Sequence, residues 1–276
     1  MKYGTLVRIN DPSEAKAKFH DLRGYGLDAC QLVYKPAEYD LADAQIIRKA
    51  AEEEGIDISA QFAGYYDGDT VWDNRYGFLT AGLNVEAYRV SRTNYVKEAV
   101  KFAKAVGTTD VVIHAGFIPN NPFAPEYALM LTSIESISKL AEKLEMNILF
   151  ETGADSPVAL LRLITDIGRN NLYINLDPAN LIMYGYGNPV DALYTFGKYV
   201  RNIHGKDGLP PTDPIKLGKE VPAGEGFVDF PKMFKALKDL NYDRYIIIER
   251  EITGPQQSVD ILKALDYFKK LYSEIY

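Results

Sequence analysis

Short apolar runs alternate with amphipathic segments along the whole chain. The runs are rich in β-branched and aromatic residues, as buried strands are, and between them apolar residues recur every three or four positions, as in helices. We predict strands at Thr5–Ile9, Ala29–Tyr34, Asp57–Phe62, Asp110–His114, Asn147–Glu151, Leu172–Asp177, Val200–His204 and Tyr245–Glu249. We predict helices after Asp11 and near Leu41–Glu54, Glu86–Ala105, Pro125–Leu144, from Pro157, and near Pro189–Tyr199, Phe230–Leu240 and Gln256–Tyr272.

This order of eight strand–helix units predicts an α/β protein with parallel strands. Eight units within 276 residues fit a closed (β/α)8 TIM barrel, whose active site lies at the carboxyl ends of the strands. No linker or low-complexity stretch divides the chain, so we expect one domain spanning residues 1–276. An open doubly wound sheet is the alternative, but neither G-x-G-x-x-G nor G-x-x-x-x-G-K occurs in the sequence.

Composition narrows the classes of partner and location. A net charge of -7 argues against nucleic-acid binding, which normally needs a basic surface. Cys30 is the only cysteine, so an intrachain disulfide is excluded. The sequence has neither a signal-peptide pattern at Met1 nor an apolar run of about 18 residues, so we expect a cytoplasmic protein without a membrane span.

Four ionisable residues stand where predicted strands end: Glu151, Asp177, His204 and Glu249. In a parallel barrel these ends converge at one mouth. Burying three carboxylates together is unfavourable unless a cation offsets their repulsion. The sequence therefore predicts one divalent metal ion held by all four residues.

The predicted ligands are three carboxylates and one imidazole, a set rich in oxygen. This set favours Mn²⁺ as the first choice, with Mg²⁺, Co²⁺ and Zn²⁺ as alternatives. Alternate residues of a strand share a face, so Asn175, Asn202 and Lys206 should point into the barrel with Asp177 and His204.

Several stretches resemble the sugar phosphate isomerase/epimerase family of xylose-isomerase-like TIM barrels. They are Val111-Val-Ile-His-Ala-Gly-Phe117, Leu149-Phe-Glu-Thr-Gly153, Asn175-Leu-Asp-Pro-Ala-Asn-Leu181, His204-Gly-Lys-Asp-Gly208, Val221-Pro-Ala-Gly-Glu-Gly-Phe227 and Ile248-Glu-Arg-Glu251. The resemblance implies the same ligands, Glu151, Asp177, His204 and Glu249. It also implies that Glu151 and Glu249 move protons on opposite faces of a sugar, as in related ketose 3-epimerases.

The chemistry that we predict is abstraction of a proton next to a carbonyl, through an enediolate stabilised by the metal. Return of the proton gives epimerisation or isomerisation. Lys206 is a candidate to donate a proton to a leaving oxygen or to hold an anionic group; the alternative is that it pairs with Asp207 or another carboxylate. Candidate substrate-binding residues are His114, Glu225 and Trp72 on strand ends and loops, and Asn180, which replaces a histidine of tagatose-epimerase-like proteins. In addition, Ala154 and Asp155 stand where many members of the resembled family have Gln-Glu.

Other functions remain open at this point. An inosose-dehydratase-like lyase acting on a keto-polyol would use the same metal and glutamates, and a non-catalytic sugar-binding or partner subunit could keep the barrel. An endonuclease IV-type nuclease is disfavoured, because the chain has only three histidines and is acidic.

The predicted partner is a sugar, sugar phosphate or keto-polyol. The loop Gly64–Leu83, with Trp72 and the pair Tyr65–Tyr66, could wall the substrate or join copies of a homo-oligomer.

Overall fold

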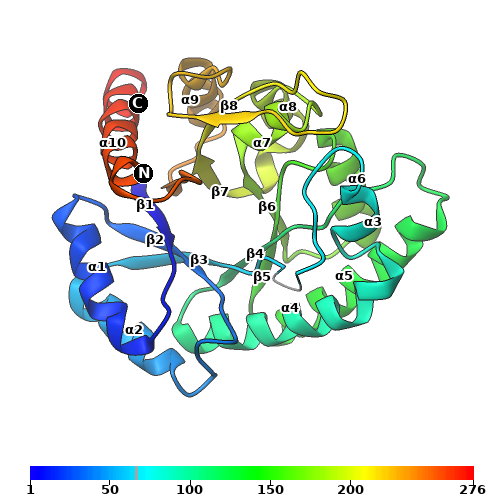
Figure 1. Ribbon diagram of the computed structural model, residues 1–276, viewed down its shortest axis with the longest axis horizontal. Coiled ribbons are helices and arrows are strands. Elements are labelled where there is room, and N and C mark those ends of the chain that lie inside the picture. Colours follow the sequence, from blue (N-terminus) through cyan, green and yellow to red (C-terminus); the bar gives the residue numbers. More distant parts are fainter. Residues whose placement is uncertain (66–67) are drawn as a thin grey trace.

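Eight parallel strands form a closed barrel in the computed structural model, which describes residues 1–65 and 68–276. Helices surround the barrel on its outside (Figure 1). The strands are β1 (Lys2–Val7), β2 (Ala29–Val33), β3 (Asp57–Phe62), β4 (Asp110–Ile113), β5 (Asn147–Glu151), β6 (Leu172–Leu176), β7 (Val200–Gly205) and β10 (Tyr245–Ile248). They follow one another around the ring in chain order, and β10 closes it against β1. The predicted TIM barrel is confirmed.

The principal helices are α1 (Ala15–Gly24), α2 (Ala44–Glu54), α4 (Glu86–Val106), α5 (Pro125–Lys143), α6 (Pro157–Ile167), α8 (Pro189–Phe196), α9 (Phe230–Asp239) and α10 (Pro255–Ile275). Several begin where the sequence places a capping side chain before a proline. Ser156 accepts a hydrogen bond from the backbone amide of Ala159, and Asn188 caps α8 in the same way. Such caps satisfy amides that have no partner within the helix.

Some boundaries and elements differ from the prediction. Strand β1 begins at Lys2 and ends at Val7, earlier than predicted, because Lys2 pairs with Tyr245 of β10. Helix α8 ends at Phe196 and a 3-10 turn, η2 (Gly197–Tyr199), follows it. The sequence did not predict the 3-10 turn η1 (Pro12–Glu14), the short helices α3 (Gly77–Thr80) and α7 (Pro178–Met183), or the hairpin of β8 (Asp207–Leu209) and β9 (Lys219–Val221).

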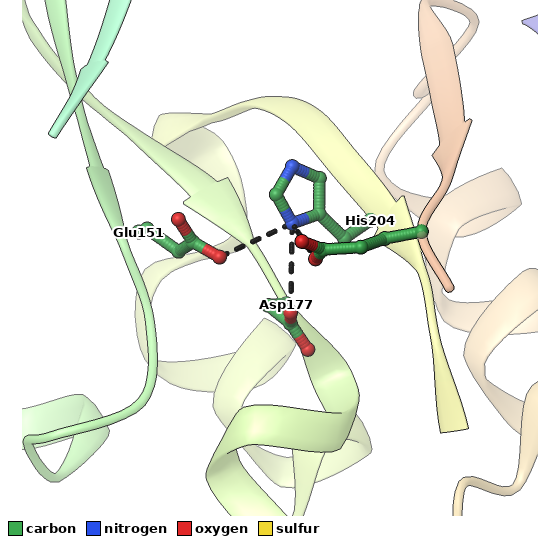
Figure 2. Close-up of side chains that lie close together, drawn as sticks. Glu151, Asp177 and His204 are labelled. Carbon is green, nitrogen blue, oxygen red and sulfur yellow. Dashed lines mark ion pairs between the residues drawn. The ribbon is translucent and has the colours of Figure 1, made fainter. Parts of the chain in front are cut away.

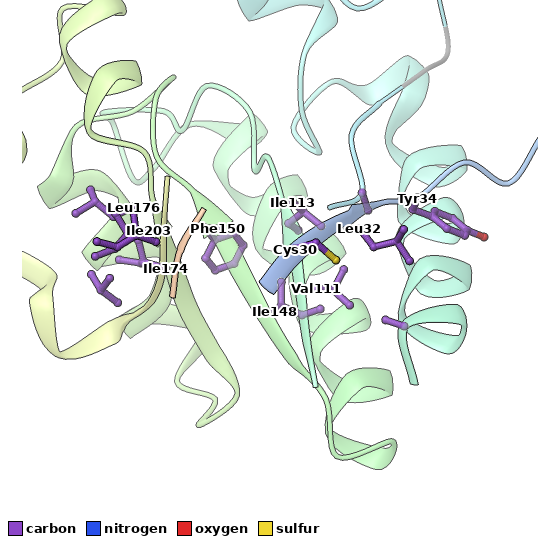
Figure 3. Close-up of a cluster of buried hydrophobic side chains, with 14 of the residues drawn as sticks. Cys30, Leu32, Tyr34, Val111, Ile113, Ile148, Phe150, Ile174, Leu176 and Ile203 are labelled. Carbon is purple, nitrogen blue, oxygen red and sulfur yellow. The ribbon is translucent and has the colours of Figure 1, made fainter. Parts of the chain in front are cut away.

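The main core lies between the strands and the surrounding helices. Figure 3 shows part of it, in which Cys30 and Leu32 of β2 lie with Val111 and Ile113 of β4. Burial raises the pKa of the Cys30 thiol, so this thiol packs as an apolar group. No helix in the described part of the chain is long and apolar enough to cross a membrane.

The interior of the barrel is divided into an apolar part and an amide part. Ala60, Val112 and Leu149 form a small apolar cluster on the inner faces of β3, β4 and β5. In contrast, β2, β6 and β7 contribute buried amides, from Gln31, Asn175 and Asn202. Asn202 donates a hydrogen bond of 2.6 Å from Nδ2 to Oδ1 of Asn175, and Gln31 Nε2 donates to the same oxygen at 3.3 Å. The inward direction predicted for Asn175 and Asn202 is confirmed.

An ionic cluster closes the amino-terminal end of the barrel. The buried carboxylate of Asp110 accepts hydrogen bonds from Nε and Nη2 of Arg201 at 3.1 and 3.2 Å. Asn147 Nδ2 donates to it at 2.7 Å, and Arg244 lies 3.5 Å away. The Arg201 guanidinium also stacks on Tyr173, 4.7 Å from its ring centre. Both oxygens of this carboxylate therefore have partners.

Candidate metal centre

Four strand ends place Glu151, Asp177, His204 and Glu249 together at the other mouth. Glu151 is the last residue of β5, His204 lies near the end of β7, and Glu249 directly follows β10. Asp177 follows β6 and is the N-cap of α7, where Oδ1 accepts the amide of Asn180 at 2.8 Å. One ligand atom from each residue lies within 4.8 Å of those of the others. The predicted convergence is thus present in the structure.

The imidazole of His204 is the centre of the cluster. Its Nδ1 lies 2.9 Å from Glu249 Oε2, 3.2 Å from Glu151 Oε1 and 3.4 Å from Asp177 Oδ2. Figure 2 shows the carboxylates of Glu151 and Asp177 turned toward this ring. His204 and Asp177 are fully buried, and Glu151 is 4% exposed. The carboxylates meet away from the screening of bulk water.

Three atoms of the cluster are buried without a hydrogen-bond partner among the described residues: Glu151 Oε2, Asp177 Oδ2 and His204 Nδ1. Asp177 Oδ2 and His204 Nδ1 face each other at 3.4 Å, whereas Glu151 Oε2 faces His114. Buried polar atoms are normally satisfied, so three such atoms in one cluster indicate a missing ligand. Three carboxylates and one imidazole nitrogen suit a divalent cation that accepts oxygen and nitrogen donors. The residues present therefore fit a metal ion.

A hydrogen bond behind His204 orients the ring for this role. Nε2 lies 3.0 Å from Oε1 of Gln31 and 3.1 Å from Nδ2 of Asn175, on the side of the ring away from the three carboxylates. When Nδ1 binds a metal, Nε2 carries the ring proton and donates it to Gln31, because an amide oxygen can only accept. Asn175 accepts from Gln31 and so holds the amide in place. Such partners fix the tautomer and direction of metal-binding histidines.

The surrounding charges shift the ionisation of the cluster. Burial alone would lower the pKa of His204, but the charges of Glu249 and Glu151 outweigh burial and raise that pKa well above its usual value. Burial would raise the pKa of Glu249, but the cations of Lys206 and His204 lower it. In the absence of a metal, the protonated imidazole and the ammonium group together offset the carboxylates.

Lys206 points into the mouth, as predicted, and contacts several acids. Its Nζ lies 3.4 Å from Asp177 Oδ2 and from Glu249 Oε2, and it donates to Glu251. Burial would lower the pKa of Lys206, but these carboxylates raise it well above its usual value. The suggested partner Asp207 is engaged elsewhere, because its oxygens accept backbone amides that include those of Gly224 and Gly226.

Three of the predicted substrate-binding residues lie near Glu151: Asn180 and His114 contact its carboxylate, and Trp72 packs on His114. Asn180 Nδ2 donates to Glu151 Oε1 at 3.4 Å, and its Oδ1 accepts from Lys206 Nζ at 3.3 Å. His114 Nε2 lies 3.4 Å from Glu151 Oε2. The Trp72 ring packs against His114 with their centres 4.6 Å apart. These residues surround the proposed base.

A cavity of about 260 Å³ opens over the cluster. Its walls include the four predicted residues Trp72, His114, Glu151 and Asn180, together with Glu249. Tyr65 also lines this cavity, whereas Tyr66 lies outside the described residues. A larger cavity, about 460 Å³, lies near Lys35 and Arg92. Its walls contain none of the four candidate ligands, so the smaller cavity is the candidate substrate site.

The structure does not bring two loop acids into the cavity wall. Glu225 is exposed, on a turn that Asp207 holds through backbone amides, and is not among the lining residues. Asp155 is buried, which raises its pKa well above its usual value, and it too does not line the cavity. A substrate contact by Glu225 stays a prediction.

Sequence reasoning missed several residues of the wall, including Leu6, Arg8, Met183, Tyr184 and Leu217. Leu6 and Arg8 follow the inward face of β1, and correct bounds for that strand would have identified them by alternation. Tyr184 ends α7, a helix that the sequence did not predict. Burial raises the pKa of Tyr184, so its hydroxyl keeps its proton and can donate a hydrogen bond into the cavity.

A closed parallel barrel with a candidate metal site of acids and one histidine at its carboxyl mouth defines a class of TIM barrels. The chain belongs to the xylose isomerase-like TIM barrel family, whose model matches residues 19–271. A xylose isomerase domain protein from Planctomyces limnophilus has a TM-score of 0.87 and 29% identity, and the match covers 99% of this chain and 98% of that one.

Other relatives are more distant. An inosose dehydratase of Clostridium botulinum is 25% identical over 158 residues, which span 51% of this chain and 51% of that protein. A D-tagatose 3-epimerase-like protein has a TM-score of 0.74 at 19% identity and covers 100% of this chain and 98% of its own, a likeness of fold. Ketose 3-epimerases, one for D-psicose and one for L-ribulose, also share the fold.

Proposed function

We propose that the protein is a divalent-metal-dependent sugar isomerase or epimerase that abstracts a proton next to a carbonyl. The observation that carries the proposal is the cluster of Glu151, Asp177, His204 and Glu249, whose ligand atoms lie within 4.8 Å of one another beside a cavity of about 260 Å³. Among the described residues, three atoms of this cluster are buried without a hydrogen-bond partner. Family membership supports it, because members are sugar epimerases and isomerases.

The metal site would be held by Glu151, Asp177, His204 and Glu249, and we propose Mn²⁺ as the ion. When bound, a divalent ion polarises the carbonyl and a neighbouring hydroxyl and so makes the adjacent carbon-bound proton more acidic. The protein fixes the orientation of these ligands. Gln31 orients His204, and capping of α7 orients Asp177.

The two glutamates would move the protons. Glu151 belongs to β5 and Glu249 follows β10, and two strands, β6 and β7, separate them around the ring. The carboxylates therefore approach a substrate in the cavity from different sides. One takes the carbon-bound proton, and the other returns a proton or accepts one from a hydroxyl. Return to the opposite face of the same carbon gives an epimer, and return to the neighbouring carbon gives an isomer.

His114 and Lys206 have supporting parts in this proposal. His114 faces Oε2 of Glu151, the oxygen that lacks another partner, and can hold that carboxylate or a substrate hydroxyl. The ammonium of Lys206 lies beside Glu249 and can hydrogen-bond a substrate oxygen. Trp72 would form a wall of the sugar pocket.

A lyase is the second candidate, and one observation favours it. Lys206 is buried among Asp177, Glu249 and Glu251, so a protonated amine is held where it can donate to a leaving hydroxyl. The similarity to an inosose dehydratase agrees with this possibility. Removal of the proton and of a β-hydroxyl would release one water from a keto-polyol.

The test is hydrogen exchange in D₂O with Mn²⁺-loaded protein and a panel of ketoses, keto-inositols and their phosphates. NMR should show deuterium entering at one carbon next to the carbonyl, with product of unchanged mass apart from the label. A product lighter by one water would establish the lyase instead. Binding of a sugar without exchange at any carbon would favour a non-catalytic sugar-binding protein and contradict both proposals.

A further inference from the structure

A second chamber adjoins the cavity over the candidate metal centre. It has a volume of about 340 Å³ and lies between the ends of β1 and β10 and the start of α10. Leu6, Arg8, Glu249 and Glu251 line both spaces. The candidate ligand Glu249 belongs to both walls, so the second chamber lies directly beside the metal centre.

Arg8 stands at the junction of the two chambers. It directly follows β1 and continues the inward face of Gly4 and Leu6. Its side chain is exposed, and within residues 1–65 and 68–276 its guanidinium forms no hydrogen bond or ion pair. Arg8 lines both chambers with Glu249 and Glu251 but forms an ion pair with neither, so its five N–H donors are available to a ligand.

The other cations near the two chambers are already occupied. Arg250 binds Glu220 at 3.0 Å and Asp260 at 2.8 Å. Lys206 binds Glu251 and lies near two ligand acids. Of the cations that the structure describes around the two chambers, Arg8 is therefore the one available to a polar group of the substrate at the junction. The planar fork of a guanidinium fits the paired oxygens of a phosphate or carboxylate better than a lone hydroxyl.

We infer that Arg8 binds an anionic oxygen group, a phosphate or a carboxylate, on a substrate that spans both chambers. This inference rests on the proposed function for the position of the carbonyl and adds the class of substrate. The carbonyl end occupies the metal cavity, and the anionic end lies at Arg8. The chain thus selects acidic sugars or sugar phosphates over neutral sugars.

Direct binding tests this without turnover. D-fructose, D-fructose 6-phosphate and 5-keto-D-gluconate are six-carbon keto compounds that carry no charge, a phosphate and a carboxylate. Their dissociation constants are measured by calorimetry for the wild type, Arg8→Gln and Arg8→Lys. Arg48→Gln is the matched control, because Arg48 is a similar cation, paired with Glu52 and remote from both chambers.

In the wild type we expect at least one anionic compound to bind about tenfold or more tightly than D-fructose, since hydrogen bonds to charged groups are strong. Arg8→Gln should reduce this preference to about twofold or less, Arg8→Lys should keep part of it, and Arg48→Gln should keep all of it. The phosphate and carboxylate arms then identify which anion is preferred. Equal affinity for all three compounds in the wild type would overturn the inference and indicate that Arg8 only balances nearby acids.

An anionic group can also bind a metal ion, so each titration is repeated on metal-free protein. A preference that disappears without metal and is unchanged in Arg8→Gln would assign the anion to the ion and contradict a role for Arg8. The unfolding midpoint and Mn²⁺ affinity of Arg8→Gln should match those of the wild type, which separates this effect from misfolding. Hydrogen exchange without an anionic preference would refute this inference alone, whereas a preference without any exchange would refute the proposed function alone.

Discussion

Both ends of the barrel bury carboxylates, but the two ends satisfy them differently. At the amino-terminal end, Asp110 has two arginines and an asparagine as partners, and each of its oxygens accepts a hydrogen bond. At the carboxyl end, the carboxylates of Glu151 and Asp177 each retain an oxygen without a hydrogen-bond partner among the described residues. A fully paired network of charges is typical of a structural role, whereas buried carboxylate oxygens that lack a partner indicate a site for a ligand.

The comparison also separates stability from function. Removal of Asp110 would leave two arginines without their common partner, which destabilises the fold. Removal of one acid from the metal-binding cluster relieves repulsion between like charges, so the fold should tolerate it while the chemistry fails. Functional sites are often regions where local stability is sacrificed in this way. Variants at the two ends should therefore have opposite effects, and four experiments test this contrast.

The largest effect is expected for Glu151→Gln. Loss of a general base and metal ligand should lower the rate of hydrogen exchange by about 10²- to 10⁴-fold. The free energy of unfolding in EDTA should stay equal or rise, because one buried like charge is removed. NMR exchange and urea denaturation measure the two quantities, with Glu142→Gln as an exposed control. A large loss of stability with activity retained would reverse the contrast.

The reverse result is expected at the amino-terminal end for Asp110→Ala. We expect a loss of about 2 kcal/mol in the free energy of unfolding, since Arg201 and Arg244 are left without this partner but remain partly exposed. Activity per folded molecule should be unchanged. Asp57→Asn is the control, because Asp57 lies at the same end but is half-exposed. An effect no larger than that of the control would show that the Asp110 cluster does not stabilise the barrel.

A smaller effect is expected for the residue that orients His204. Gln31→Met removes the oxygen that accepts from Nε2 and should weaken Mn²⁺ binding by about tenfold or more. Gln61→Met is the matched control, because Gln61 is equally buried but donates to Ala99 outside the barrel. Calorimetry with Mn²⁺ measures both. Equal metal affinities for the two variants would contradict an orienting role for Gln31.

The smallest effect is expected for the dependence of Mn²⁺ affinity on pH. The pKa of His204 is raised in the metal-free protein, so a bound proton stabilises that state. This stabilisation is complete below the unfolded histidine pKa of about 6.5 and is lost as pH rises through the higher folded value. Because the metal competes with this proton at Nδ1, Mn²⁺ affinity should rise with pH by at most about tenfold per unit. Titrations at pH 6, 7 and 8 that give a constant dissociation constant would contradict this competition.

The sequence predicted the four ligands because a local pattern marks each of them. Glu151, Asp177, His204 and Glu249 each end an apolar strand, and the rule that parallel strands end at one mouth brings them together without further information. The structure places all four in one cluster. The inward direction of Asn175, Asn202 and Lys206 followed from alternation along the same strands.

Other parts of the site depend on contacts that no local pattern reveals. Gln31 lies on β2 and Arg8 directly follows β1. Neither strand carries a predicted ligand that would identify its inward face, and the predicted bounds of β1 were too late in the sequence. Helix α7 forms because Asp177 caps it while also facing His204, so one residue has a structural and a chemical role. The turn carrying Glu225 is held away from the cavity wall by Asp207.

The order of strands and helices, the closed barrel and the acidic mouth were therefore determined by the amino-acid sequence itself, because strand periodicity and strand ends are local properties. Only the tertiary structure decided which buried atoms lack a hydrogen-bond partner and which nitrogen of His204 faces the carboxylates. It also decided that Arg8 lines two chambers. Those features depend on register and on side chains that approach through space from distant strands, and sequence spacing does not encode such distances.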